Sequence, residues 1–165
     1  MFFKYLHQTV SLYFPLFTLP DEVITCTQDG YTSVNIDDYD GLVQISSPGF
    51  FDEGLCYAND LNCGWTIHTN DPEAIITIVD SYHEVSAISN LCFFYPALSS
   101  FQLEREYEYV SVHDGPTSES PELGVFKEEH GEWERVHSYG PEMAVQFRSD
   151  ESVAFKGFVM LLGKV

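Results

Sequence analysis

Short apolar and β-branched runs follow one another along the chain from about Gly41 onward, separated by turn residues. The run Trp65-Thr66-Ile67-His68-Thr69 alternates apolar and polar side chains, as a half-buried strand does. The run Ile75-Ile76-Thr77-Ile78-Val79 is rich in β-branched residues, which favour strands. Similar patterns predict strands at residues 42–46, 107–113, 143–147 and 157–162. Regular strands with Gly, Pro, Asn and Asp between them predict an all-β sandwich or barrel.

Helical periodicity is poor throughout, and only residues 81–89 are expected to form a short helix. The polar stretches 116–122 and 127–140 are expected to be surface loops, with a tight turn at Asp114-Gly115. No internal repeat and no low-complexity linker divides the chain. One domain is therefore the simplest organisation.

We expect that domain to cover residues 39–165, after an N-terminal leader segment over residues 21–38. Residues 1–20 are expected to be a secretory signal peptide, because Lys4 precedes an apolar run from Val10 to Leu19. A first strand would give a similar pattern, so that alternative stays open. The run is too short to span a bilayer, and the rest of the sequence offers no other candidate for membrane insertion.

Acidic residues dominate the composition: 26 of the 165 residues are Asp or Glu and only 7 are Lys or Arg, a formal net charge of −19. Because 44% of the chain is hydrophobic, the charge does not indicate disorder. An acidic surface repels nucleic acids and anionic membranes, and it attracts metal cations or proteins that offer Lys and Arg. The simpler interpretation is that the charge only keeps a secreted protein soluble.

Four cysteines are present, and no two of them form a C-x-x-C motif that would indicate a zinc or redox site. An even number of cysteines in a small domain favours two disulfides and an oxidising compartment. Three connectivities are compatible with four cysteines. Four buried free thiols in a cytosolic protein are the alternative.

Six segments, in order, resemble the motifs of CUB domains. They are the stretches Gly41–Phe50, Asn62–Ile67 (NCGWTI), Phe101–Glu104 with Tyr107–Gly115 (FQLE, YEYVSVHDG), Leu123–Phe126 (LGVF), Met143–Ser152 (MAVQFRSDES) and Lys156–Phe158. The resemblance covers roughly residues 41–162. It implies a jelly-roll-like, antiparallel β-sandwich that serves as a secreted protein-binding module and not as an enzyme.

The resemblance also implies how the cysteines pair. Cys26 with Cys63 is similar to the first disulfide of the family, whereas Arg105 and Lys127 stand where the family usually has its second. Cys56 and Cys92 are additional and are hypothesised to pair with each other. Such a bridge would anchor the stretch before Ser100, which is longer than the family usually has there, and would limit its loop entropy.

CUB domains often hold a calcium ion at one end of the sandwich, where it orients carboxylates that bind a partner's basic side chain. Carried over to this chain, the ligands are Glu104, Glu108, Asp150 and Ser152, with Glu84 as the alternative first ligand. The alternation of side chains along the strand also supports a cation at this position. Glu108 shares a strand face with Val110 and Val112, which should face the core. A charged group there is costly to bury unless a cation, a proton or a partner's Lys or Arg compensates it.

Two interpretations of these carboxylates remain: a calcium site, or solvated charges at a strand edge that prevent edge pairing. The calcium site predicts an extracellular interaction module. Its acidic ligands at one end of the sandwich, ordered by Ca²⁺, would bind Lys or Arg of another protein. The alternative function is a carbohydrate- or lipid-binding β-sandwich without calcium, which would use the aromatic residues Phe93, Phe94 and Tyr95. Because the sequence contains no G-x-S-x-G, H-E-x-x-H or phosphate-binding loop, no enzymatic activity is expected.

Overall fold

The computed structural model describes residues 22–27, 29–50, 56–80, 107–127, 136–151 and 157–165. This part of the chain is built almost entirely of strands and one 3₁₀ turn. The elements are β1 (Val23–Thr25), β2 (Asp29–Asn35), η1 (Ile36–Tyr39), β3 (Leu42–Ser46), β4 (Asn62–His68), β5 (Ile76–Asp80), β6 (Tyr109–Asp114), β7 (Glu122–Phe126), β8 (Glu142–Arg148) and β9 (Val159–Lys164). No helix in these residues is long and apolar enough to cross a membrane.

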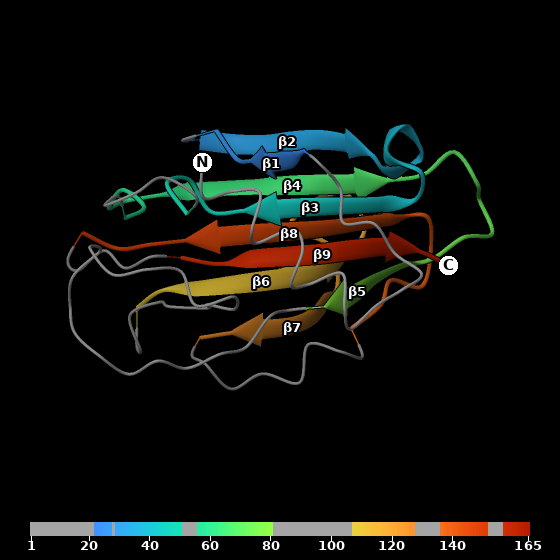
Figure 1. Ribbon diagram of the computed structural model, residues 1–165. Coiled ribbons are helices and arrows are strands. Elements are labelled where there is room, and N and C mark those ends of the chain that lie inside the picture. Colours follow the sequence, from blue (N-terminus) through green and yellow to red (C-terminus); the bar gives the residue numbers. More distant parts are fainter. Residues whose placement is uncertain (1–21, 28, 51–55, 81–106, 128–135, 152–156) are drawn as a thin grey trace, which may run out of the picture.

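The strands form two stacked sheets, so the predicted all-β sandwich is confirmed (Figure 1). One sheet has four strands in the order β1-β3-β9-β5, and the other has five in the order β2-β4-β8-β6-β7. Neighbouring strands are antiparallel except at β1–β3 and β2–β4, which are parallel. Both exceptions lie at sheet edges, so the central pairings are those of an antiparallel sandwich.

The core lies between the inner faces of the two sheets. In β4 and β8 every second residue points inward, and Trp65, Ile67, Val145 and Phe147 are all fully buried. Trp65 reaches the opposite sheet: its indole Nε1 donates a hydrogen bond to the backbone oxygen of Ile24 in β1, at 3.0 Å. The alternation that predicted these strands is therefore also what fills the core.

All six predicted strands are present, with shifts of a few residues at their ends. Three strands were not predicted: β1, β2 and β7. Since β1 and β2 belong to the two sheets and Val34 and Ile36 are buried in the core, the sandwich begins upstream of the boundary expected at residue 39. The stretch 21–38 is therefore not merely a leader. Its strands escaped detection because β2 is interrupted by Gly30 and carries mostly polar residues.

The segment expected to be a surface loop over residues 127–140 is partly built into the fold. Its described end pairs with β5, where Ile78 N donates to Val136 O at 3.0 Å and Ser138 N donates to Ile76 O at 2.8 Å. Ser138 is fully buried. These residues pair with β5 because β5 lies at the edge of its sheet, where its backbone N–H and C=O groups would otherwise have no partner. The helix expected at residues 81–89 lies outside the described residues.

A disulfide joins Cys26 to Cys63, with their Cα atoms 5.7 Å apart, as the CUB resemblance implied. The bond joins the segment between the edge strands β1 and β2 to the core-facing side of β4. Cys56 is also disulfide-bonded. Its expected partner, Cys92, lies outside the described residues, so the Cys56–Cys92 pairing stays a prediction.

Candidate functional site

Glu108 lies immediately before β6 and is fully buried, with 0% of its surface exposed. Its side chain continues the inward-facing row of Val110 and Val112, as the alternation predicted. The hydroxyl of the buried Tyr57 donates a hydrogen bond to Glu108 Oε2. The Tyr57 ring is itself held edge-on against Phe147, with ring centroids 5.2 Å apart. The core therefore contains a carboxylate at one end of the sandwich, fixed by a tyrosine from a distant part of the chain.

The segment that carries Tyr57 is fastened to the turn after β8. Asp60 N donates to Asp150 O at 2.8 Å, and Leu61 N donates to Ser149 Oγ at 2.9 Å. A third hydrogen bond, from Ser149 N to Leu61 O at 3.0 Å, completes the contact. These bonds hold two acidic residues, Asp60 and Asp150, on adjacent backbone segments.

Strand register brings Glu108 and Asp150 to the same end of the five-stranded sheet, where β8 ends (at the left of Figure 1). Tyr109 of β6 pairs with Arg148 of β8, so Glu108, one residue earlier, lies at the level of the residues that follow Arg148. Asp150 is half-buried there and Asp60 is exposed. We call these three acidic residues, Glu108, Asp150 and Asp60, the acidic rim.

The other predicted calcium ligands, Glu104, Ser152 and the alternative Glu84, lie outside the described residues. Within the described ranges, no group of three or more His, Cys, Asp or Glu side chains is arranged to hold a metal ion. The calcium site therefore stays a prediction.

Tyr57 and Asp60 are residues of this region that the motifs did not indicate. Both lie in a segment without strand periodicity, and Tyr57 is 51 positions from the carboxylate that it contacts. An aromatic residue shortly before the Asn-Cys-x-Trp run was the only available signal.

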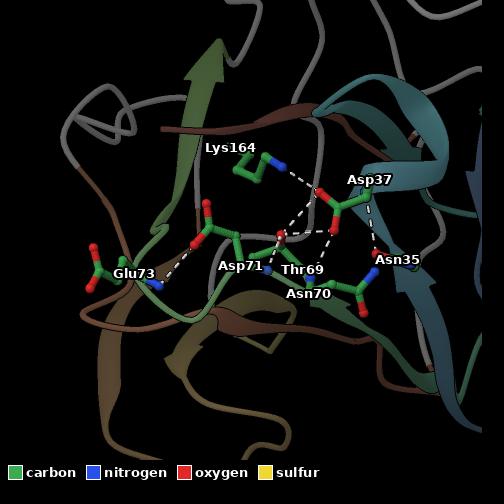
Figure 2. A network of polar contacts seen from close by, with 7 residues as sticks. All are labelled: Asn35, Asp37, Thr69, Asn70, Asp71, Glu73 and Lys164. Carbon is green, nitrogen blue, oxygen red and sulfur yellow. Dashed lines mark hydrogen bonds and ion pairs between the residues drawn. The ribbon is translucent and has the colours of Figure 1, made fainter.

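A second polar cluster lies at the opposite end of the sandwich, around Asp37 in η1 (Figure 2). Lys164 Nζ donates to Asp37 Oδ1, Thr69 Oγ1 donates to both carboxylate oxygens at 3.0 Å, and Asn70 N donates to Oδ2 at 2.8 Å. The hydrogen bond from Lys164 is the main reason that the pKa of Asp37 is lowered from 3.8 to about 2, and the bond from Asn70 N adds to the effect. With its acceptors occupied by the chain itself, this carboxylate is a structural clamp between η1, the β4–β5 turn and β9.

Replacing Asp37 with Asn is expected to remove a stabilisation that depends on pH. The folded-state pKa lies below the unfolded value, so wild-type protein gains stability above about pH 4 and loses that gain as the pH falls towards about 2. Denaturant unfolding at several pH values should show wild-type protein more stable than Asp37→Asn at pH 7, with the difference shrinking between pH 4 and 2. An equal difference at all pH values would contradict the assignment. Asp38→Asn, a change at the exposed neighbouring residue, is the control.

Part of the chain is similar to a known family. A family model described as CUB domain matches residues 96–161. Human Tolloid-like protein 2 is 35% identical over 63 residues, which cover 36% of this chain and 6% of that protein. The chain thus spans only a small part of this relative.

Two of the similar solved structures contain CUB domains. The CUB1-EGF-CUB2 domain of human MASP-1/3 is 26% identical, with a TM-score of 0.49 over 75% of this chain and 41% of that chain. The MASP-1 CUB2 domain bound to Ca²⁺ is 16% identical, with a TM-score of 0.43 over 80% of this chain and 96% of that chain.

The chain is a β-sandwich of two sheets, and the CUB domain model matches part of it, residues 96–161. The resemblance indicated by the sequence motifs is confirmed over residues 96–161. That range includes Glu104, Glu108, Asp150 and Ser152, so all four residues of the first ligand set assigned by motif lie inside the matched region, whereas the alternative Glu84 lies outside it.

Proposed function

We propose that this protein is a secreted, extracellular interaction module that binds a basic side chain of another protein at its acidic rim, with no enzymatic activity. The observation that carries the proposal is the burial of Glu108 at the end of the sandwich where Asp150 and Asp60 also lie. A carboxylate in such a position attracts positive charge more strongly than one in bulk water, because the surroundings screen it less.

The acidic rim favours a Lys or Arg side chain of a partner protein as its ligand. The chain carries a net charge of −19, so its long-range field draws basic surfaces towards it and repels nucleic acids. Complementary charge of this kind accelerates association and selects the partner. Tyr57 and the hydrogen bonds between residues 60–61 and 149–150 hold the acidic groups in place before the partner arrives.

Calcium is the ion that the donor chemistry fits. Glu108 and Asp150 offer carboxylate oxygens, which hard cations such as Ca²⁺ prefer, and no thiol or imidazole belongs to the predicted set. Glu104 and Ser152, or Glu84 in place of Glu104, would complete the ligands. Bound calcium would neutralise part of the buried charge and orient the remaining oxygens towards a basic partner.

Changing Asp150 to Asn should weaken calcium binding about tenfold or more, because a neutral amide replaces a charged oxygen ligand. Isothermal titration calorimetry of the whole chain with Ca²⁺ measures this directly. Asp38→Asn is the matched control, since it removes the same charge at the opposite end of the sandwich and should leave the affinity within about twofold. Equal calcium affinity in wild type and Asp150→Asn would rule out the site.

A further inference from the structure

The outer face of the five-stranded sheet carries a row of polar and aromatic side chains that is separate from the inward-facing Glu108. Arg148 in β8 pairs with Asn62 in β4 on one side and with Tyr109 in β6 on the other. Directly paired side chains on one sheet face lie about 4.5–5.5 Å apart at Cβ, so Arg148 is a neighbour of both Asn62 and Tyr109. Arg148 and Asn62 are exposed and Tyr109 is half-buried. We call these three residues the outer row.

Elsewhere on this face, polar side chains satisfy one another. His113 Nε2 and Ser111 Oγ are 2.9 Å apart, and His113 Nδ1 is 3.1 Å from Ser120 O. Likewise, Ser33 Oγ lies 3.2 Å from His68 Nε2.

The outer row differs from the rest of this face. Gln146 Nε2 donates to Asn62 Oδ1 at 2.7 Å, and the NH₂ group of the exposed Asn62 makes no hydrogen bond within the described residues. Neither the Arg148 guanidinium nor the Tyr109 hydroxyl makes a hydrogen bond or ion pair within the described part of the chain. The row therefore presents a cation, a phenol and an amide that are available to a ligand.

These groups match a small ligand that combines a carboxylate with a hydroxylated ring. An arginine binds a carboxylate through two parallel hydrogen bonds. A tyrosine ring packs on an apolar ring face while its hydroxyl remains available for a hydrogen bond. An amide donates to and accepts from hydroxyl groups. Tyr107, 60% exposed and two residues before Tyr109, adds aromatic surface near the row.

The charge of the whole chain narrows the choice. A polyanion such as a chain of uronic acids is repelled by a protein of net charge −19. A single carboxylate on an otherwise neutral oligosaccharide is repelled less, and Arg148 offers it a positive charge nearby. We propose that the outer row binds the terminal sialic acid of a glycan, on a face distinct from the acidic rim. The aromatic residues first considered for carbohydrate binding, Phe93, Phe94 and Tyr95, lie outside the described residues.

The test is a titration of the whole chain with 3′-sialyllactose, followed by NMR, with lactose as the neutral control and a glucuronic acid glycoside as the second acidic sugar. Sialyllactose should bind, lactose should bind at least about tenfold more weakly, and Arg148→Gln should weaken sialyllactose binding about tenfold. Lys127→Gln removes an equal charge from another exposed site beside the same sheet and should change the affinity less than about twofold. Thermal melts confirm that both variants are folded.

Equal affinity of wild type and Arg148→Gln for sialyllactose would overturn the proposal, as would equal binding of lactose. So would the absence of binding, or tighter binding of either the glucuronic acid glycoside or a short acidic peptide. The sialyllactose titration repeated on Asp150→Asn separates the two proposals. That variant should keep sialyllactose binding, whatever becomes of calcium binding at the acidic rim.

Discussion

Replacing Trp65 with alanine is expected to lower the free energy of unfolding by about 3–5 kcal/mol, the range found for large aromatic residues removed from a core. Trp65 is fully buried and packs edge-on against Phe158, with ring centroids 5.8 Å apart. It also joins the two sheets through its hydrogen bond to Ile24 O. The variant loses packing, creates a cavity and leaves a carbonyl oxygen without its donor. Since domains are stable by only about 5–15 kcal/mol, it should be close to unfolding.

Trp65→Phe separates these contributions. Phenylalanine keeps most of the aromatic packing but has no N–H group for Ile24 O, so the loss should be smaller than for alanine. Leaving a buried acceptor unsatisfied costs about 1–3 kcal/mol. Urea unfolding followed by fluorescence or circular dichroism measures both variants. If Trp65→Ala cost less than about 1 kcal/mol, the cross-sheet role of Trp65 would be wrong.

Glu108→Gln is expected to weaken the response to calcium while leaving the fold intact. A glutamine side chain has nearly the same shape, and its carbonyl oxygen can still accept the Tyr57 hydrogen bond. Its neutral amide removes the charge of the carboxylate and keeps the size of the side chain, so the variant tests the charge alone. Calcium affinity should fall about tenfold or more, because a carboxylate ligand is lost. Glu142→Gln is the matched control: it makes the same chemical change at an exposed residue at the far end of β8.

The fold was predictable where side-chain alternation was strong. The runs around Trp65 and Val145 alternate because one face of each strand is buried, so the sequence pattern and the burial have the same cause. β2 is different, since its polar residues and Gly30 give no such pattern. Its position depends on the parallel pairing with β4, a tertiary contact that no local pattern reveals.

The candidate site, too, was predictable only in part. The inward direction of Glu108 followed from its spacing to Val110 and Val112, and its full burial agrees with that expectation. The assignment of Asp150 as a calcium ligand came from the CUB motif and stays a prediction. The contact of Tyr57 with Glu108 and the pairing of Arg148 with Asn62 and Tyr109 could not be predicted, because each depends on the register of strands that are distant in sequence.

Thermal unfolding of wild type, Glu108→Gln and Glu142→Gln, each in calcium and in chelator, tests the acidic rim most directly. A ligand bound only by the folded state stabilises it, by about 2.7 kcal/mol at roughly 100 times its Kd. For a chain of this size that raises the Tm by roughly 5–10 °C. We expect this rise in wild type and in Glu142→Gln, and at most about half of it in Glu108→Gln, whose calcium affinity is at least about tenfold lower. A wild-type Tm that is the same in calcium and in chelator, or an equal rise in Glu108→Gln, would contradict the account.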